Sequence, residues 1–389
     1  MRIDRSSETR GVEAGVDGFP DILQVHTCLA VISKSGNTKE EAFGEGFQMK
    51  RLLVPEPVSA GIILSYKCNS ECKHCMYACS PKWKDDWISI EDMQEVLTEL
   101  AARIDKRYPV GFRRIGINYG LHFTGGEPFL NFQLLARGAK MASELKIPAT
   151  FVETNCFWCV NDEVTRAKLT QLKDAGLNGV LISVNPFILE QVPFERTERA
   201  ARISADIFGE NVVVYQQFFY HQFKMLNFKG SMPFDAYLQK AGTESLDHVE
   251  LIPMGRAAYE LGDLFRKHRA KEFFGESCKE ELTRPWHVHV DNYCNYITGY
   301  CAGISLGDAR KLSSICEEGV DLDENPLIKL LVTDMRELHE LAVREFGYTE
   351  SAGGYVSKCH LCLHLREHIV RQTDEFRELQ PKEFYTNLG

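Results

Sequence analysis

AGIILSYKCNSECKHC, residues 60–75, places three cysteines directly after a short apolar segment. The apolar residues 58–64 fit a buried β-strand. The loop that follows carries Cys68, Cys72 and Cys75 with the spacing C-x-x-x-C-x-x-C. Three thiolates from one short loop can ligate three irons of a [4Fe–4S] cluster and leave the fourth iron without a protein ligand. Such an open iron can bind a substrate or a cofactor. Zinc, held by the three thiolates and His74, is the alternative.

Downstream of this loop, strand-like and helix-like segments alternate. We predict a helix over residues 90–104, with Ser89 as its N-cap. Alternation of this kind is typical of a parallel α/β sheet, open or closed into a barrel, with ligands at the carboxyl ends of the strands. The other predicted strands are residues 115–123, 149–153, 179–184, 211–216 and 248–252, and the other predicted helices are residues 134–145, 163–175 and 198–208.

The alternation stops near residue 271, where cysteines become frequent again. We therefore predict three parts: an N-terminal extension (1–55), a core domain (56–270) and a smaller cysteine-rich α+β domain (271–389). In the last part, residues 286–301 read as a β-hairpin with an Asp-Asn turn, and residues 327–345 read as one helix.

Two further patterns lie in the C-terminal part. Cys359 and Cys362 form a C-x-x-C pair, which we place on a loop after Gly353-Gly354. His287 and His289 are two residues apart and should face the same way on a strand. We interpret these histidines as partly buried hairpin residues rather than as metal ligands.

Composition narrows the possible partners and compartment. The net charge of -10 over 389 residues argues against binding to nucleic acid or to an anionic membrane surface. The polar residues 1–24 lack the apolar core of a signal peptide, so we expect a cytoplasmic protein. Disulfides do not persist there, and thirteen unevenly spaced cysteines favour thiolate ligands of metal. No partner can be named for Cys28 or Cys79.

The segment CNSECKHC, residues 68–75, resembles the cysteine motif of the radical S-adenosylmethionine (radical SAM) superfamily, with His74 in the aromatic slot before the last cysteine. A second motif, Gly125-Gly126-Glu127-Pro128, follows a predicted strand and is similar to the family turn that meets the methionine amino group of the cofactor. Its glycines allow close backbone approach, and its carboxylate can accept from an ammonium.

Weaker matches follow at the ends of later strands. Glu153-Thr154-Asn155 resembles the Thr-Asn-Gly turn of the family, with Cys156 in place of glycine. Ser183-Val184-Asn185 resembles a stretch whose side chains approach the ribose and carboxylate of the cofactor, and Arg196 lies where relatives supply a guanidinium to that carboxylate. A structural role is the alternative for each. Cys156 and Cys159 could also be a redox pair or two ordinary thiols.

The resemblance extends over about residues 58–255 and implies a partial (β/α)6 TIM-like barrel. It implies that S-adenosylmethionine binds the open iron of a [4Fe–4S] cluster and is reductively cleaved to a 5′-deoxyadenosyl radical, which abstracts a substrate hydrogen. Such an enzyme works anaerobically with a low-potential electron donor of the flavodoxin or ferredoxin type.

The C-terminal cysteines resemble the auxiliary-cluster domains called twitch and SPASM. We expect Cys278, Cys301, Cys359 and Cys362 to hold one auxiliary [4Fe–4S] cluster, with Cys294 and Cys316 in reserve. Zinc is the alternative, because a four-cysteine site suits both metals.

Relatives with such domains often modify peptides, so we expect a peptide or protein side chain as substrate. A small metabolite or cofactor precursor is the alternative within the enzyme class. A non-catalytic iron–sulfur or zinc protein that transfers electrons or scaffolds a partner is the alternative outside it. The Gly125-Gly126-Glu127-Pro128 turn argues against this last class, because an electron carrier needs no ammonium site.

Overall fold

The structure is a computed structural model in which residues 50–389 are described. Most of the predicted N-terminal extension, with Cys28, lies outside these residues.

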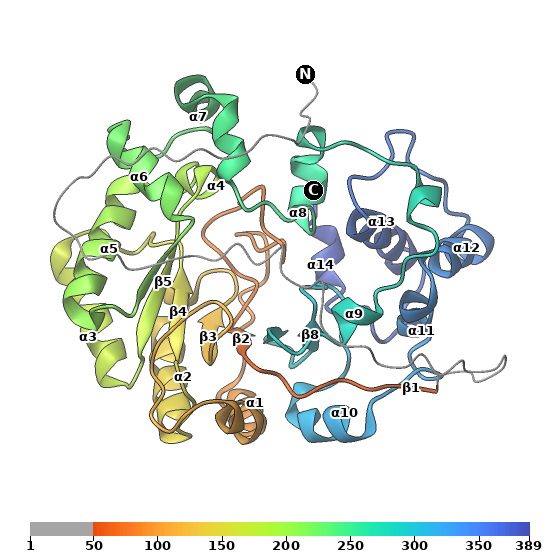
Figure 1. Cartoon of the computed structure of the whole chain (residues 1–389), viewed down its shortest axis with the longest axis horizontal. Helices are drawn as coiled ribbons and strands as arrows, with labels where there is room; N and C mark the ends of the chain where they lie inside the picture. Colours follow the sequence, from red (N-terminus) through yellow and green to blue (C-terminus); the bar gives the residue numbers. More distant parts are fainter. Residues whose placement is uncertain (1–49) are drawn as a thin grey trace, which may run out of the picture. The chain divides into compact units, whose positions relative to one another are not determined.

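A seven-stranded sheet forms the centre of the described chain (Figure 1). The strands lie in the order β6-β5-β4-β3-β2-β7-β8, and every neighbouring pair is parallel except β7 and β8. The mixed α/β class and the largely parallel sheet that the sequence predicted are therefore confirmed. The strands are β2 (Ala60–Ile63), β3 (Leu121–Thr124), β4 (Phe151–Thr154), β5 (Gly179–Ser183), β6 (Val212–Tyr215), β7 (Val288–Val290) and β8 (Tyr296–Thr298).

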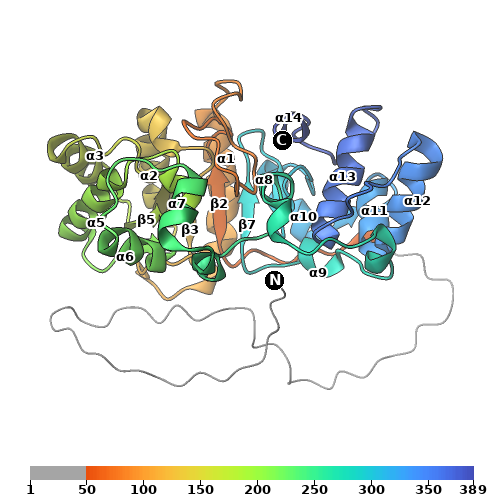
Figure 2. The same cartoon turned by 90° about the horizontal axis from the view of Figure 1, so that it is seen from above.

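A helix lies between each two successive parallel strands from β2 to β6, as βαβ connections require. Helix α3 packs against α5, and α1 packs against α2 (Figure 2). The crossing helices are α1 (Ile90–Ile104), α2 (Phe132–Glu144), α3 (Asp162–Asp174) and α5 (Phe194–Phe208), with the shorter α4 (Pro186–Leu189), α6 (Gln217–Met225) and α7 (Phe234–Ala241) after β5 and β6.

Helix α1 shows how local sequence sets these boundaries. Its residues Met93, Val96, Leu97 and Leu100 are buried, at the three-and-four spacing of one helix face. The Ser89 hydroxyl accepts from the backbone N–H of Asp92 at 2.9 Å, which caps the first turn as predicted.

The remaining elements are β1, at the start of the described residues, and those that follow β6 and its helices. Strand β1 (Arg51–Leu52) pairs with β9 (Val320–Asp321) in a separate two-stranded sheet. The helices are α8 (Arg256–Glu260), α9 (Lys279–Leu282), α10 (Leu312–Glu318), α11 (Pro326–Thr333), α12 (Met335–Phe346), α13 (Lys358–Val370) and α14 (Glu383–Thr386).

The predicted sixth barrel strand, residues 248–252, is wrong. A 3₁₀ turn covers Thr243–His248, and the chain then runs to α8 without a strand. The sixth parallel strand is instead β7, on the far side of β2. Because β6 and β8 lie at opposite edges, the sheet is open and does not close into a barrel.

Two predictions in the C-terminal part also need correction. The single helix over 327–345 is divided into α11 and α12, because Asp334 is extended and its carboxylate caps the backbone N–H of Arg336. Cys359 and Cys362 lie on α13 and not on a loop, because Ser357 caps that helix by accepting from the N–H of His360 at 3.0 Å. The predicted hairpin over 286–301 is confirmed as β7 and β8.

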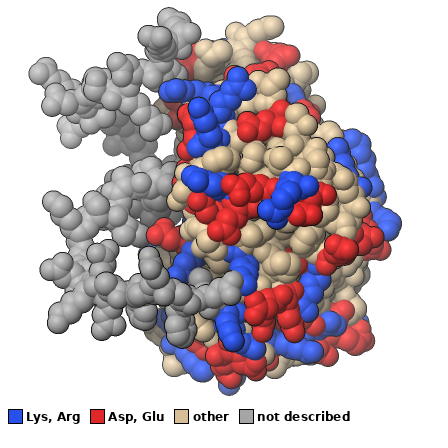
Figure 3. Space-filling model, turned by 90° about the vertical axis from the view of Figure 1, so that its right-hand side faces the viewer, with Lys and Arg blue, Asp and Glu red and all other residues tan. Residues whose placement is uncertain are grey.

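The sheet continues across the predicted boundary at residue 270, since β7 pairs with β2 through Ala60, Gly61 and Ile62. The three-part division of the chain stays a prediction. None of the helices within residues 50–389 combines the length and apolar character that crossing a membrane requires. Basic and acidic side chains are interspersed on the face shown in Figure 3.

The packing of β3 against α2 provides a test of this arrangement of strands and helices. Phe123 is fully buried, and a Cβ on Gly138 of α2 would lie 2.9 Å from its ring. We predict that Phe123→Ala lowers the free energy of unfolding by about 3–5 kcal/mol, measured by denaturant titration. The exposed Phe218 is the control, and Phe218→Ala should cost under about 1 kcal/mol. Equal losses for the two variants would contradict the packing.

Candidate functional site

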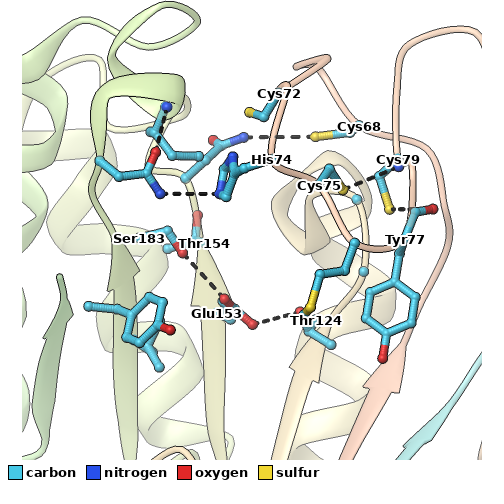
Figure 4. Close-up of a pocket in the computed structure, with 18 of the residues that line it drawn as sticks. Cys68, Cys72, His74, Cys75, Tyr77, Cys79, Thr124, Glu153, Thr154 and Ser183 are labelled. Atoms are coloured by element: carbon cyan, nitrogen blue, oxygen red, sulfur yellow. Dashed lines mark hydrogen bonds between the residues drawn. The ribbon is translucent and has the colours of Figure 1, made fainter. Parts of the chain in front are cut away.

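A cavity opens at the carboxyl ends of the parallel strands, where the sequence predicted the chemistry. The cysteine loop after β2 forms one side of it, and the ends of β3, β4 and β5 form the other (Figure 4). Of the predicted site residues, those that line the cavity are Cys68, Cys72, His74, Cys75, Gly125, Gly126, Asn155, Ser183 and Asn185.

Backbone groups and one arginine shape the cysteine loop. The N–H groups of Ser70 and Cys79 donate to the sulfurs of Cys68 and Cys75, at 3.4 and 3.3 Å. Arg256, which is buried, donates through Nη1 to the carbonyls of Cys72 and Cys79 at 3.0 and 3.1 Å. These bonds hold the loop curled, with its sulfurs in the cavity lining.

The surroundings of the three thiol groups suit binding to positively charged iron ions. Burial raises the pKa of Cys68 and Cys72, so free thiolates are costly here. A hydrogen bond from Cys79 lowers the pKa of Cys75 to about 6, and Arg256 acts in the same direction. Bound metal would deprotonate the thiols and offset the cost of burying their charge. The residues therefore fit an iron–sulfur cluster.

The separation of the sulfurs favours a cluster over a single zinc ion. A tetrahedral zinc with Zn–S bonds of about 2.3 Å holds its sulfurs about 3.8 Å apart. In the described part of the chain, the only three His, Cys, Asp or Glu residues whose ligand atoms all lie within 4.8 Å of one another are histidines. Neither the first three cysteines nor the four C-terminal ones are that close together.

The two glycines of the Gly125-Gly126-Glu127-Pro128 turn are required by close packing. Gly125 has φ +126°, and a Cβ on Gly126 would lie 1.9 Å from the carbonyl oxygen of Lys67. The turn therefore lies directly against the start of the cysteine loop. No side chain fits between them.

Glu127 does not line the cavity. Its carboxylate is buried and accepts from the N–H groups of Phe129 and Asn155, at 3.1 and 2.9 Å, and from the hydroxyl of Thr154. In this structure it therefore joins the turn after β3 to the turn after β4. Contact between Glu127 and a cofactor stays a prediction.

The predicted side chains on β4 and β5 differ in their partners. Asn155 Nδ2 donates to Asn69 Oδ1 at 2.9 Å, which ties the β4 turn to the cysteine loop. Ser183 donates to Glu153 at 3.3 Å, and Thr124 donates to the same carboxylate at 2.9 Å (Figure 4). Asn185 caps α4 through its oxygen, and its amide nitrogen lies 3.1 Å from His74 Nε2.

His74 and Arg196 have different surroundings. The His74 ring stacks on Phe187, and burial lowers the pKa of His74 to about 4, so it is neutral. Arg196 does not line the cavity, and its guanidinium donates to the carbonyl of Phe157.

Cys156 takes the backbone conformation of the glycine that it replaces, with φ +66°. The N–H of Cys156 donates to the hydroxyl of Thr154 at 3.0 Å, which supports this strained turn. Cys156 and Cys159 are both fully buried, and the backbone N–H of Cys159 donates to the carbonyl of Cys156 at 3.1 Å. Burial from solvent disfavours exchange with a partner protein's thiol.

The four C-terminal cysteines that we predict as ligands of an auxiliary cluster all line a second cavity. Cys278 precedes α9, Cys301 follows β8, and Cys359 and Cys362 lie on α13. Burial raises the pKa of Cys359 to about 11, and the neighbouring Cys362 adds to the shift. The reserve residues Cys294 and Cys316 do not line this cavity.

Sequence reasoning missed four residues that the structure places at these sites. Arg256 and Tyr300 had no recognisable motif, and Tyr300 lines both cavities. Glu153 belongs to the Glu153-Thr154-Asn155 stretch, but the sequence alone did not indicate it as a site residue. His122 is the third histidine beside His287 and His289, and only the pairing of β3, β2 and β7 reveals it.

Neither the protein-family profiles nor the curated protein sequences contain a match to the chain. Among solved structures, the chain is similar to "BtrN in complex with AdoMet and 2-DOIA", with 12% identity and a TM-score of 0.37 over 72% of this chain and 89% of that one. It is also similar to "Native anSMEcpe with bound AdoMet", with 13% identity and a TM-score of 0.38 over 81% of this chain and 98% of that one. TM-scores in this range do not establish a common fold, so any functional assignment rests on this chain's own residues.

The buried Glu127 gives a pH test of the site. Burial raises the pKa of Glu127 to about 7. Between about pH 4.5 and pH 7 the Glu127 carboxyl therefore stays protonated in the folded state, whereas it loses its proton in the unfolded state. The stabilisation that comes from protonated Glu127 is complete below about pH 4.5 and is lost as the pH rises to about 7. We predict that Glu127→Gln removes this part of the pH dependence of the unfolding free energy.

The measurement is denaturant unfolding at intervals across that range, for the original chain and the variant. The exposed Glu144→Gln is the matched control and should leave the slope unchanged. A Glu127→Gln variant with the slope of the original chain would contradict the assignment.

Proposed function

We propose that this chain is a radical SAM enzyme. Cys68, Cys72 and Cys75 hold a [4Fe–4S] cluster, and S-adenosylmethionine binds its fourth iron in the cavity beside Gly125 and Gly126. When bound, the cluster and cofactor supply one-electron cleavage to a 5′-deoxyadenosyl radical, which takes a hydrogen atom from the substrate.

The observation that carries this proposal is the position of the open side of the cysteine loop. The three cysteines supply three thiolates, and the cavity beside them continues along the ends of β3, β4 and β5. The Gly125-Gly126 turn brings bare backbone to this point, where a ligand can approach closely. A pure electron carrier needs neither the unligated iron nor a cavity.

The chain's own residues then position the ligand. Asn155, Ser183 and Asn185 present amide and hydroxyl groups along one wall, at the ends of two neighbouring strands. Such groups suit the ribose and carboxylate of the cofactor, as the resemblance implies. The apolar side of the cavity, with Met76 and Ile188, keeps water from the reacting carbon.

We further propose that Cys278, Cys301, Cys359 and Cys362 hold an auxiliary [4Fe–4S] cluster. Arg366 Nε donates to Cys362 Sγ at 3.3 Å, so a buried cation already faces this site. Tyr300 lies between the two cavities and shortens the path for an electron from the substrate to the auxiliary cluster. A low-potential donor of the flavodoxin or ferredoxin type would supply the first electron.

The substrate class proposed is a peptide or protein side chain. The cavity wall away from the cysteine loop carries Glu153, Tyr215, Gln216 and Glu250, whose polar groups suit one inserted side chain. A small metabolite is the alternative. From the net charge and the polar N-terminal residues, we propose no nucleic-acid or membrane partner and an anaerobic, cytoplasmic setting for the enzyme.

Iron counting separates the two clusters. After anaerobic reconstitution we predict about eight irons per chain, and about four in either Cys68/Cys72/Cys75→Ala or Cys278/Cys301/Cys359/Cys362→Ala. Only the first variant should lose all 5′-deoxyadenosine formation with dithionite and S-adenosylmethionine. Cys316→Ala, outside both groups, is the control and should keep about eight irons. Zinc in place of iron, or 5′-deoxyadenosine from the first variant, would contradict the proposal.

Substrate class is tested with a set of candidate peptides and metabolites. We expect a peptide whose mass changes only in the presence of S-adenosylmethionine, detected by mass spectrometry together with 5′-deoxyadenosine. Conversion of a metabolite with every peptide unchanged would instead support the alternative.

A further inference from the structure

Three buried histidines meet on the cavity wall without a role in the function proposed above. His122 lies on β3, His289 on β7, and His287 just before β7. One nitrogen from each lies within 4.8 Å of the others. All three line the same cavity as the cysteine loop.

The sheet register explains how they come together. Gly61 of β2 is the direct partner of His122 on one side and of His289 on the other. Partners in adjacent strands point to the same face, so two imidazoles lean over the position between them. A Cβ on Gly61 would lie 2.5 Å from His122 Nε2 and 2.7 Å from His289 Cδ2. Only glycine leaves this space open.

A contact with Ser59 fixes the tautomer of His287. Ser59 Oγ donates to the carbonyl of Trp286 at 2.7 Å, so toward His287 Nδ1, also at 2.7 Å, the hydroxyl can only accept. His287 therefore carries its proton on Nδ1, and its Nε2 is free to ligate. His289 Nδ1 lies 2.9 Å from the hydroxyl of Tyr77, and either group can be the donor. A ring nitrogen fixed by an outer-shell partner is the usual arrangement of a metal-binding histidine.

His122 has no hydrogen-bond partner on either ring nitrogen, although both are buried. A buried imidazole without a partner is costly, and a ligand in the shared space would offset that cost. Glu153 Oε2 lies 3.9 Å from His122 Nε2 and can balance a positive charge.

We propose that His122, His287 and His289 bind a divalent transition-metal ion such as Zn²⁺, with an open position facing the cavity. Zinc bonds to nitrogen of about 2.0 Å place the nitrogens about 3.3 Å apart, so small side-chain rotations close the site. The open position takes an oxygen, nitrogen or sulfur donor of the substrate. The site is distinct from both cysteine groups and does not depend on S-adenosylmethionine chemistry.

Cobalt is the probe. The anaerobically reconstituted full chain, with its iron–sulfur sites filled, should bind one equivalent of Co²⁺ and show d–d bands without a thiolate-to-cobalt charge-transfer band. His122→Gln, His289→Gln and Gly61→Ala should each weaken binding at least about tenfold, the loss that even outer-shell changes cause. The exposed His221→Gln is the matched control and should bind cobalt as the original chain does.

Two further measurements distinguish loss of this metal site from failure of the proposed enzyme activity and from misfolding of a variant. Cys68/Cys72/Cys75→Ala should retain the cobalt site even if 5′-deoxyadenosine formation fails, which separates this site from the proposed enzyme. X-ray absorption on the zinc-loaded original chain should show imidazole scattering without sulfur neighbours, whether or not the variants fold. No bound cobalt, a thiolate band, or equal binding by His122→Gln would overturn the metal site.

Discussion

The cysteine loop keeps its shape through a buried guanidinium. Arg256 donates to the carbonyls of Cys72, Ala78 and Cys79, and to that of Asn387 near the C-terminus. The carbonyls of Cys72 and Ala78 also accept from the N–H of Cys75 and the indole of Trp83, whereas Arg256 is the only donor within the described residues to the carbonyl of Cys79. Without Arg256 that carbonyl would lose its hydrogen bond, which destabilises the loop. One side chain thus couples the loop after β2, the helix α8 and the last residues of the chain. The cavity depends on this coupling, because the loop forms one of its walls.

The second constraint is close approach of backbone. Gly125 and Gly126 let the β3 turn touch the cysteine loop, and Gly61 lets two imidazoles meet above β2. Both places line the same cavity, together with Thr124 and Glu153. The Glu153 carboxylate accepts from Thr124 and Ser183 and lies 3.9 Å from His122 Nε2.

Much of the fold could be predicted from the sequence because its signals are local. The spacing of Met93, Val96 and Leu97 with the Ser89 cap marked α1, and the strand-and-helix alternation marked the parallel sheet. The strand expected at 248–252 was wrong because a short apolar run does not specify pairing, and the vacant sheet edge was filled by β7 from much later in the chain. Ser357 as an N-cap could have shown that Cys359 lies in the first turn of a helix.

The site was predicted in part for the same reason. The cysteine spacing and the Gly-Gly turn are local patterns, and the structure brings Cys278, Cys301, Cys359 and Cys362 to one cavity as expected. Arg256 and His122 act through partners distant in sequence, so no local pattern could indicate them. The cavity also excludes the Glu127 carboxylate, which local hydrogen bonds hold behind the turn.

The most direct test of the central claim is electron paramagnetic resonance of Cys278/Cys301/Cys359/Cys362→Ala, which isolates the cluster on the first cysteine loop. After anaerobic reconstitution and reduction, this variant should show one [4Fe–4S]⁺ signal whose g-values shift when S-adenosylmethionine is added, because the cofactor binds the open iron. A signal that does not change on addition of the cofactor, or a variant without iron, would contradict the account.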